Sequence, residues 1–458
     1  MSTPQRQLFG TDGIRGVAGE PPLDERTIFA VGQALGHRWP APARVVIGQD
    51  TRESSEWIGN TLARGLSSVG VQVASAGVIT TPGVACLART LGYQAGVVIS
   101  ASHNPWRDNG IKIFSGDGYK LPDAIEHEIE REIFSLLEKG SKVPDRGPAI
   151  ATLPGSVELR RAYDAWLARD AAGVQLNNLK VLVDCANGAA TTVAPEMFRA
   201  CSVKTKFVHD TPDGKNINDN CGALHPDVVA RAVAEANQRG EGFDLGITLD
   251  GDADRALFSD ANGRVINGDA VLLVAARDLQ SRGKLANDTV VATTMSNMGL
   301  EIALRNSNIR MLRAPVGDKY VLEETQKTGA TLGGEQSGHI IFRDGDATTG
   351  DGLLTALRVL EIMARTKRAL ADLIGDMKVF PQVIKNVRVR EKRPLSGVPE
   401  VERAIRAAES ELDGNGRVVV RYSGTEALAR VMIEANSEER MNRLADAIAS
   451  AIQQTLGR

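Results

Sequence analysis

The sequence predicts an α/β protein built from several domains. Its 458 residues are too many for one hydrophobic core, so at roughly 100–200 residues per domain we expect about three or four domains. Runs of β-branched residues alternate with helical patterns, and each run ends in a loop of Gly, Asp, Ser or Asn. Strands that alternate with helices indicate layered sheets, in which ligands gather at loops beyond the carboxyl ends of the strands.

The alternation can be followed along the chain in five segments: RVVIGQDTR (44–52), AGVVIS (95–100), KVLVDCANGAA (180–190), FDLGITLDGDADR (243–255) and TVVATTMSNMGLEIALRN (289–306). The C-terminal part reads differently. GRVVVRYSGTEALARVMIEA (416–435) predicts strand, loop and strand, and the pattern that follows it predicts one helix. We therefore expect three similar α/β/α domains and a smaller C-terminal α+β domain.

Composition shifts predict the domain boundaries. The stretch from 139 to 156 is rich in Gly, Pro and Ser and fits a linker. Asn262-Gly263 suits a type I′ hairpin turn near the second boundary, and the third lies near VFPQVIKNVRVR (379–390). The predicted domains are 1–155 with the loop ISASHNPWRDNGIK, 156–260 with LDGDADR, 261–378 with GGEQSGH and 379–458 with RYSGTEALAR.

Charge and cysteine usage exclude several classes of protein. With 54 Lys and Arg against 57 Asp and Glu, the net charge of −3 predicts no partner among nucleic acids or anionic membranes. No run approaches the ~18 apolar residues of a membrane span, and MSTPQRQLFG lacks an export signal. The four cysteines form no C-x-x-C pair, which favours reduced thiols. We expect a cytoplasmic protein.

The loop LDGDADR predicts a cation site. Asp250, Asp252 and Asp254 alternate, so in extended chain their carboxylates point the same way, and Mg²⁺ or Ca²⁺ would relieve their repulsion. An EF-hand is excluded because Arg255 stands where that loop needs Gly, and Ala261 where it needs Glu. A solvated acidic turn is the alternative. A second acidic segment is predicted to be only a loop: FRDGDATTGDG, with Asp344, Asp346 and Asp351.

The motif GGEQSGH (333–339) resembles a phosphate loop only superficially. His339 and Ile340 stand where a Walker motif needs Lys and Ser or Thr, so nucleotide binding is rejected. The flanking glycines allow close backbone approach, and Glu335 and Ser337 suit sugar hydroxyls. A glycine-rich turn with a capping serine is the alternative.

The motif RYSGTEALAR (421–430) predicts an anion nest. Hydroxyls and backbone N–H groups in a turn are flanked by two arginines, and the members are Arg421, Ser423, Gly424, Thr425 and Arg430. A hairpin with surface arginines is the alternative. Arg15 in FGTDGIRG and Arg52 in GQDTR offer further cations, but neither identifies a site by itself.

The loop ISASHNPWRDNGIK (99–112) offers a nucleophile. Acyl transfer is disfavoured because no G-x-S-x-G elbow surrounds Ser102. A serine that carries a phosphoryl group needs a cation and an acid/base instead, which the three aspartates and a desolvated Lys112 would supply. We therefore favour Ser102 over Ser100 as the nucleophile and expect His103 to support the loop.

Taken together, the motifs resemble one family. SASHNP with DNGIK, DGDADR, GGEQSGH and SGTE, in this order, are similar to the α-D-phosphohexomutase superfamily. FGTDGIRG and VGDKYV (316–321) resemble most its branch that acts on glucosamine phosphates. The resemblance implies a four-domain, heart-shaped phosphohexomutase of the isomerase class with a central cleft. It also implies that glucosamine 6-phosphate and glucosamine 1-phosphate interconvert through phosphoserine and a bisphosphate, on the route to UDP-N-acetylglucosamine and peptidoglycan precursors.

The resemblance also implies roles for the site residues. Ser102 would be phosphorylated, and Asp250, Asp252 and Asp254 would bind one Mg²⁺ with the phosphoserine completing its shell. Arg15, Lys112 and His339 would surround the reacting oxygen, and Arg255 would lie near the phosphoserine. Glu335 and Ser337 would read sugar hydroxyls. The non-reacting phosphate would be held by Arg421, Ser423, Gly424, Thr425 and Arg430.

Further expectations follow from the resemblance. The partners would be a sugar-phosphate substrate, hexosamine 1,6-bisphosphate as activator or intermediate, and a second copy in a homodimer. The sequence departs from the family pattern at two positions. Ala427 replaces the usual Pro, which concerns the rigidity of the SGTE turn, and Lys319 replaces the usual Arg, which concerns substrate affinity. We also expect a hinge at 379–385. Three alternatives stay open: a phosphomannomutase/phosphoglucomutase, a metal-dependent sugar phosphatase and a non-catalytic sugar-phosphate sensor.

Overall fold

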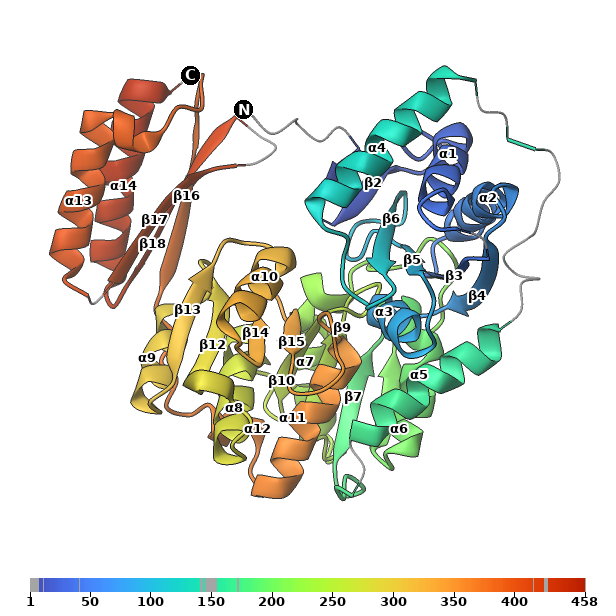
Figure 1. Cartoon of the computed structure of the whole chain (residues 1–458). Helices are drawn as coiled ribbons and strands as arrows, with labels where there is room; N and C mark the ends of the chain where they lie inside the picture. Colours follow the sequence, from blue (N-terminus) through green and yellow to red (C-terminus); the bar gives the residue numbers. More distant parts are fainter. Residues whose placement is uncertain are drawn as a thin grey trace. The chain divides into compact units, whose positions relative to one another are not determined.

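The computed structural model describes residues 8–10, 12–40, 42–140, 143–144, 155–170, 173–414, 416–423 and 427–457. Its sheets and flanking helices confirm the predicted α/β fold (Figure 1). The chain divides into two compact units, residues 1–293 with 314–374, and residues 294–313 with 375–458.

The first sheet of the larger unit carries the N-terminal motifs. Its strands are β1 (Phe9–Gly10), β2 (Gly13–Val17), β3 (Arg44–Gln49), β4 (Gln72–Val78), β5 (Ala95–Ile99) and β6 (Asp108–Ser115), in the spatial order β1-β2-β6-β5-β3-β4. Strand β3 runs parallel to β4 and β5, and β6 is antiparallel to β5. Helices α1 (Glu25–Gly36), α2 (Ser55–Ser68) and α4 (Asp123–Glu138) cover one face and share one hydrophobic core, while α3 (Thr81–Thr90) packs on β3, β5 and β6. Every residue of β5 is buried, as expected of a strand covered on both faces.

The second sheet carries the acidic loop. Its strands are β7 (Lys180–Asp184), β8 (Lys204–Val208), β9 (Leu245–Leu249), β10 (Ala256–Asp260) and β11 (Val265–Ile266), in the order β11-β10-β9-β7-β8. Its region also includes α5 (Ser156–Asp170), η2 (Ala189–Thr192), α6 (Ala194–Ala200), η3 (Gly222–Leu224) and α7 (Pro226–Gln238). Helix α7 packs on β9 and β10, and α5 packs on α3 and α6.

The predicted type I′ turn in this sheet is wrong. That turn needs positive φ at both central residues, and only Gly263, at +81°, has it. The last pair in register is Ser259↔Val265, so the loop is longer than two residues. The Asp260 carboxylate accepts the N–H groups of Asn262 and Arg264, which stabilises this wider loop.

The third group of strands carries the GGEQSGH motif. Strand β12 (Thr289–Thr293) is parallel to β14 (Leu332–Gly334), which is antiparallel to β15 (Ile340–Phe342). The accompanying helices are α8 (Gly268–Ser281), η4 (Ala286–Asp288), α10 (Asp318–Thr328), α11 (Gly352–Thr366) and α12 (Leu370–Leu373). Helix α10 packs on β12 and β14, and α8 packs on β14 and α11.

One local plan occurs three times in the larger unit. A strand with a parallel neighbour ends in a polar loop, and the chain then returns as an antiparallel strand: β5 to β6, β9 to β10 and β14 to β15. The loops are 100–107, 250–255 and 335–339. The serine, acidic and GGEQSGH motifs therefore occupy equivalent positions in three sheets.

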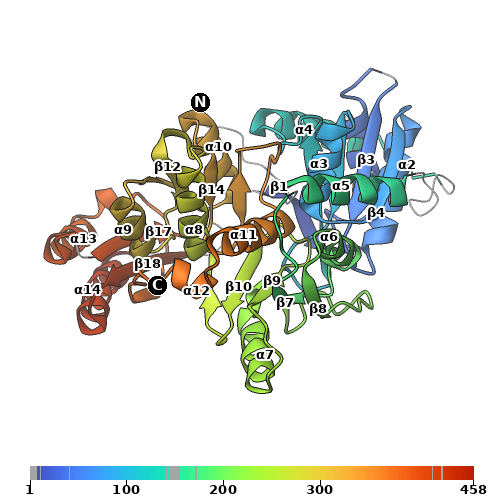
Figure 2. The ribbon, with the colours of Figure 1, turned by 90° about the horizontal axis from the view of Figure 1, so that it is seen from below.

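The smaller unit has a simpler sheet. Strands β16 (Gln382–Arg388), β17 (Gly416–Tyr422) and β18 (Leu428–Ala435) are antiparallel in the order β16-β18-β17. Helices α13 (Pro399–Leu412) and α14 (Glu438–Leu456) both lie on one face and bury one core against it (Figures 1 and 2). The unit also includes α9 (Met298–Asn306), most of β13 (Arg310–Ala314) and η5 (Leu395–Gly397).

Two bulk expectations can be compared with the described residues. None of their helices combines the length and hydropathy needed to cross a bilayer. All four cysteines are free thiols, with Cys201 partly buried and the others buried.

Candidate active site

The turn after β5 holds Ser102 against the acidic loop at 250–255. Its hydroxyl donates to Oδ2 of Asp250 over 2.7 Å, and the residue is only 1% exposed. Its φ is +53°, a left-handed conformation that costs a residue with a Cβ about 1–2 kcal/mol. The surrounding loop must therefore hold Ser102 in this conformation.

Polar side chains provide that support from three directions. Ser100 Oγ accepts the Ser102 N–H at 3.0 Å and donates to Asp50 at 2.6 Å. Arg52, ion-paired with Asp50, donates to the carbonyl of Ser102 at 3.1 Å. Asn218 donates to the same carbonyl at 2.9 Å. Ser100 thus supports the loop rather than pointing into the acidic cluster.

The acidic loop approaches Ser102 closely because position 251 is glycine. A Cβ on Gly251 would lie 2.6 Å from the Ser102 carbonyl oxygen and 2.8 Å from Asn218 Nδ2. Contacts under about 3 Å between these atoms are repulsive, so a larger residue would push the two loops apart. Gly251 therefore sets the distance between the serine and the aspartates.

The three aspartates form one buried cluster. Oxygen atoms of Asp250, Asp252 and Asp254 lie within 4.8 Å of one another, and the residues are at most 6% exposed. Oδ1 of Asp252 and Oδ1 of Asp254 are buried and accept no hydrogen bond from any described residue. Such orphaned carboxylate oxygens are costly unless a cation binds them, and oxygen-only ligands suit Mg²⁺. The residues present therefore fit a divalent cation.

Burial and neighbouring charges move the pKa values of Asp250 and Asp254 in opposite directions. Burial, with Asp254 and Asp252 nearby, raises the pKa of Asp250 well above its usual range. Burial acts in the same sense on Asp254, but Lys112 and His339 outweigh it and hold the pKa of that carboxyl below its usual range. The cluster without a cation thus retains its proton most readily at Asp250, the ligand nearest Ser102.

Lys112 lies beneath the cluster on β6. Its Nζ donates to Asp252 Oδ2 at 2.7 Å and lies 3.0 Å from Asp12 Oδ2 and 3.7 Å from Asp254 Oδ2. Burial disfavours its charge, but these carboxylates raise the pKa of Lys112 above its usual range. Lys112 is therefore a cation in this arrangement and does not act as a base.

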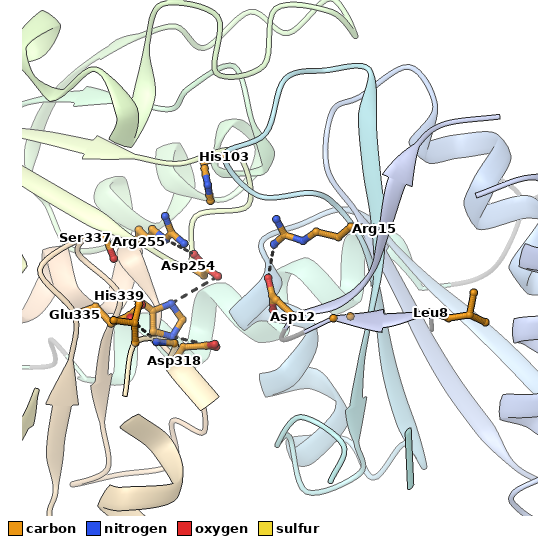
Figure 3. Close-up of a pocket in the computed structure, with 14 residues that line it drawn as sticks. Leu8, Asp12, Arg15, His103, Asp254, Arg255, Asp318, Glu335, Ser337 and His339 are labelled. Atoms are coloured by element: carbon orange, nitrogen blue, oxygen red, sulfur yellow. Dashed lines mark hydrogen bonds and ion pairs between the residues drawn. The ribbon is translucent and has the colours of Figure 1, made fainter. Parts of the chain in front are cut away.

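A pocket of about 540 Å³ opens beside the cluster in the larger unit (Figure 3). Its lining includes Asp12, Arg15, His103, Asp254, Arg255, Asp318, Glu335, Ser337 and His339. Arg15 and Asp12 lie on one side, and Asp254, His339 and Asp318 on the other. A phosphorylated sugar has the size and polarity for such a space.

The basic side chains of the pocket differ in their proton states. Burial, reinforced by the cations of Arg255 and Arg15, lowers the pKa of His103 to about 4, so this ring is neutral. Its Nδ1 lies 3.4 Å from Ser102 Oγ, a long contact consistent with loop support. Arg15 is ion-paired with Asp12 and donates to the carbonyl of Ala101 at 3.4 Å.

His339 faces two carboxylates across the pocket. Its Nδ1 lies 3.6 Å from Asp254 Oδ2, and its Nε2 lies 3.8 Å from Asp318 Oδ2. Burial lowers its pKa, but Asp254, Asp318 and Glu335 raise it to about 9. The Gly350 N–H donates to Nε2 at 3.1 Å, so the first proton of the ring belongs on Nδ1, toward Asp254.

The predicted sugar-reading residues also line the pocket. Glu335 Oε1 accepts the Gly317 N–H at 3.1 Å, which leaves its other oxygen for a ligand. Ser337 belongs to the same loop and lines the same pocket. Arg255 Nε lies 3.7 Å from Asp254 and 4.0 Å from Asp250, between the acidic cluster and the pocket.

The predicted phosphate grip belongs to the smaller unit. Arg421 and Arg430 stand directly opposite each other on β17 and β18, so two cationic side chains flank the turn between these strands. Lys392 donates to the carbonyl of Ser423 at 2.7 Å, which adds a third cation near the turn. Gly424 and Thr425 lie outside the described residues.

Sequence reasoning did not identify several residues of the site. Asp12, Lys120 and Asp318 form ion pairs around the pocket, and Asn218 holds the serine loop. Asp12 and Asp318 occur within FGTDGIRG and VGDKYV, so those motifs contained a usable signal. Lys319, one of the departures, is ion-paired with Asp123 and does not line the pocket.

Comparisons with known proteins cover the whole chain. Models of the phosphoglucomutase/phosphomannomutase family match four times: alpha/beta/alpha domain I at 6–139, domain II at 164–263, domain III at 267–380 and the C-terminal domain at 384–451. Proteins named phosphoglucosamine mutase from Koribacter versatilis and Solibacter usitatus are 63% and 49% identical; the matches cover 100% and 99% of this chain and 99% of each relative. A phosphoglucomutase/phosphomannomutase family protein from Burkholderia thailandensis has a similar solved structure, with a TM-score of 0.76, 24% identity and 97% coverage of both chains.

Proposed function

The chain belongs to the phosphoglucomutase/phosphomannomutase family, and from that premise we propose that it interconverts glucosamine 6-phosphate and glucosamine 1-phosphate. The protein is a phosphohexomutase, an isomerase-type enzyme. The full-length relatives named phosphoglucosamine mutase support the choice of sugar, and they agree with the branch that FGTDGIRG and VGDKYV predict.

One observation carries the proposal: Ser102 Oγ contacts a buried cluster of three aspartates, two of whose oxygens accept no hydrogen bond from any described residue. A serine of a hydrolase would instead need a histidine base aligned with its hydroxyl. A phosphoserine brings negative charge to this cluster, which a divalent cation would neutralise. The site therefore suits a serine that carries a phosphoryl group.

We assign one Mg²⁺ per chain to Asp250, Asp252 and Asp254, with the phosphate on Ser102 as a further ligand. When bound, the cation neutralises the oxygens of the phosphoryl group in transfer. This chain's own residues do the rest. We assign Arg15, Lys112 and His339 to the surroundings of the reacting oxygen. Arg15, Arg255 and His339 line the pocket, and Lys112 lies behind it against Asp12 and Asp252, which supports this assignment.

The reaction proceeds by two phosphoryl transfers. A sugar hydroxyl oxygen attacks the phosphorus of phosphoserine 102, the bond from Ser102 Oγ to phosphorus breaks, and the hydroxyl proton passes by way of a base in the pocket to Ser102 Oγ. The resulting hexosamine 1,6-bisphosphate reorients. Ser102 Oγ then gives up its proton and attacks the other phosphate, the bond from that phosphorus to the sugar oxygen breaks, and the sugar oxygen takes up a proton by way of Lys112 or His339.

Substrate recognition divides between two sites. Glu335 and Ser337 read the sugar hydroxyls in the pocket. Arg421, Ser423, Gly424, Thr425 and Arg430 hold the phosphate that does not react. Because each end of the sugar carries a phosphate at some stage, one grip serves both orientations. Turnover in the bisphosphate needs room, so the hinge at 379–385 stays a prediction.

The wider setting is also proposed. The substrate is a sugar phosphate, and the product feeds UDP-N-acetylglucosamine synthesis in the cytoplasm. The net charge of −3 is in keeping with a partner that is neither nucleic acid nor an anionic membrane. A homodimer is predicted, and size-exclusion chromatography with light scattering tests it.

A substrate comparison tests the choice of sugar. kcat/KM is measured for glucosamine 6-phosphate, mannose 6-phosphate and glucose 1-phosphate, with Mg²⁺ and hexosamine 1,6-bisphosphate present. The proposal predicts the highest value for glucosamine 6-phosphate. A higher value for mannose or glucose phosphate would make the protein a phosphomannomutase/phosphoglucomutase instead.

Inorganic phosphate release tests the two remaining alternatives. A mutase converts its substrate without net release, and it requires the bisphosphate to restore the phosphoserine. Stoichiometric phosphate release would indicate a sugar phosphatase. Binding of the sugar phosphate without either reaction would indicate a sensor.

A further inference from the structure

A partly buried chain of alternating charges runs through the active-site region of the larger unit. It begins at Lys112, whose Nζ lies 3.0 Å from Asp12 Oδ2. The other oxygen of Asp12 accepts from Lys120 Nζ at 2.5 Å, and Lys120 Nζ also donates to Asp318 Oδ2 at 2.5 Å. Four groups thus form three consecutive contacts between opposite charges.

The two ends of this chain meet the catalytic machinery. At one end Lys112 donates to Asp252 at 2.7 Å. At the other end Asp318 lies 3.8 Å from His339 Nε2, and both line the pocket (Figure 3). The chain therefore joins the two candidate proton carriers by a route that does not pass through the acidic cluster.

Asp12 is the centre of the arrangement. It accepts from Arg15 and Lys120 and pairs with Lys112, so one carboxylate holds three cations. Burial raises the pKa of Asp12, but Lys112, Lys120 and Arg15 outweigh it and hold the pKa well below its usual range. Asp12 is thus an anion that fixes both Arg15 and Lys112 in place.

The members come from separate parts of the sequence. Asp12 lies between β1 and β2, Lys112 belongs to β6, Lys120 follows β6 and Asp318 begins α10. The side chain of Lys112 is 2% exposed and that of Lys120 is 15% exposed. Because little water reaches these amines, loss of one charge would leave its partners poorly compensated and free to move.

Stability alone is a weak reason for such a chain. Buried ion pairs cost desolvation, and apolar replacements of similar volume are often neutral or stabilising. Here Asp12 and Asp318 both line the pocket, and they contact Lys112 and His339, the two residues to which we assign proton transfer. These ion pairs therefore fix the positions of the side chains around the pocket rather than adding net stability to the fold.

We propose that Asp12, Lys120 and Asp318 are positioning residues. Asp12 holds Arg15 and Lys112 in place, and Lys120, which contacts both Asp12 and Asp318, fixes their distance from the Asp318–His339 pair. The inference rests on the proposed mutase function and extends it to residues that do not touch the reacting atoms. Misplacement by about 1 Å can cost about 100-fold in rate, so the chain acts on kcat through geometry.

The test removes the amine of Lys120, which joins Asp12 to Asp318. Lys120→Met keeps the stem and deletes the charge, whereas Lys120→Arg keeps the charge. We expect Lys120→Met to lower kcat about 10- to 100-fold, with KM for glucosamine 6-phosphate changed less than about threefold, and Lys120→Arg to recover most of kcat. The matched control is Arg358→Met, which breaks the Arg358–Asp344 pair, 3.3 Å long and also in the larger unit. It should lower the melting temperature similarly and leave kcat unchanged.

A double mutant separates positioning from independent effects. If Asp318 acts through Lys120, Lys120→Met with Asp318→Asn should be no slower than Lys120→Met alone. The inference would be overturned if kcat of the double mutant fell by the product of the two single-mutant factors, or if Lys120→Met left kcat unchanged. If Lys120→Met fails to fold, Asp318→Asn alone must show the fall in kcat without a rise in KM. Absence of mutase activity in the wild type would instead refute the proposed function.

Discussion

Ser102 Oγ and Asp250 Oδ2 lie 2.7 Å apart, although 148 positions of sequence separate the two residues. The contact exists because β5 and β9 each end in a polar loop before an antiparallel return strand. Gly251 lets the two loops touch. This relationship connects the nucleophile to the metal ligands, and the predictions below depend on it.

Removal of the Ser102 hydroxyl should abolish turnover without unfolding the protein. Ser102→Ala deletes only Oγ, so the melting temperature should stay close to the wild-type value while kcat becomes unmeasurable. Ser100→Ala is the matched control, because Ser100 supports the loop but carries no phosphate in this account. It should retain reduced activity. Near wild-type kcat in Ser102→Ala would refute the assignment of the nucleophile.

Chelation should stop the reaction, because the acidic cluster then keeps uncompensated charge. EDTA is expected to remove activity and added Mg²⁺ to restore it. Asp254→Asn should raise the Mg²⁺ concentration needed for half-maximal rate at least about tenfold. Asp344→Asn, from the second acidic segment, should leave that concentration unchanged. A rate independent of metal would contradict the site.

Gly251→Ala should separate the two loops. Its Cβ would stand 2.6 Å from the Ser102 carbonyl, so one loop must move by several tenths of an ångström or more. We expect kcat to fall about 10- to 100-fold with a smaller change in sugar-phosphate KM. Gly70→Ala provides a control at a glycine with open space around it, which has φ of +86° and should affect stability alone. Full activity of Gly251→Ala would show that the spacing is not needed.

Asp351 should make stability depend on pH. It caps α11, and burial raises its pKa from 3.8 to about 6, although backbone N–H groups and Tyr163 oppose that shift. The folded state therefore holds a proton that the unfolded state has released, and stability falls as pH rises from about 3.8 to about 6. The difference amounts to about 3 kcal/mol at most.

Denaturant unfolding at several pH values checks this. Asp351→Asn keeps an acceptor for the helix N-terminus but removes the titration, so its stability should vary less with pH over that interval. Parallel pH profiles of wild type and variant would exclude Asp351 as the source.

Arg430 should contribute to phosphate binding rather than to the fold. It faces Arg421 across β17 and β18, so the two guanidinium groups can bind one phosphate together. We expect Arg430→Gln to raise KM about tenfold or more. Arg417→Gln is a contrasting control, since Arg417 binds Glu434 at 2.9 Å within the same unit. It should lower the melting temperature and leave KM unchanged; the reverse pattern would argue against the phosphate site.

The sequence predicted elements and motifs better than the contacts between them. The α/β class followed from strand and helix periodicity, and the three polar loops lie at the carboxyl ends of β5, β9 and β14, where ligands gather in α/β sheets. Asn262-Gly263 misled because the Asp260 carboxylate organises a longer loop there. The Asn-Gly dipeptide alone does not show that a nearby carboxylate will accept the backbone N–H groups of the turn and widen it.

The sequence did not predict the ion-pair chain of Lys112, Asp12, Lys120 and Asp318, because its members meet only in the folded protein. Lys120 and Asp318 are 198 positions apart, and only the folded sheets bring them together. Lys112 shows the same limit, because its burial was anticipated but the raised pKa depends on Asp12 and Asp252, which no local pattern places nearby. Charge partners that meet only through tertiary packing leave no spacing signal in the chain.

The central claim is that Ser102 carries the transferred phosphoryl group. The most direct measurement is mass spectrometry of the intact protein and its peptides after incubation with hexosamine 1,6-bisphosphate and Mg²⁺. The account predicts one phosphate per chain, located on Ser102, that is lost to glucosamine 6-phosphate or glucosamine 1-phosphate on mixing. An active enzyme with no phosphate on Ser102, or with the phosphate on another residue, would contradict it.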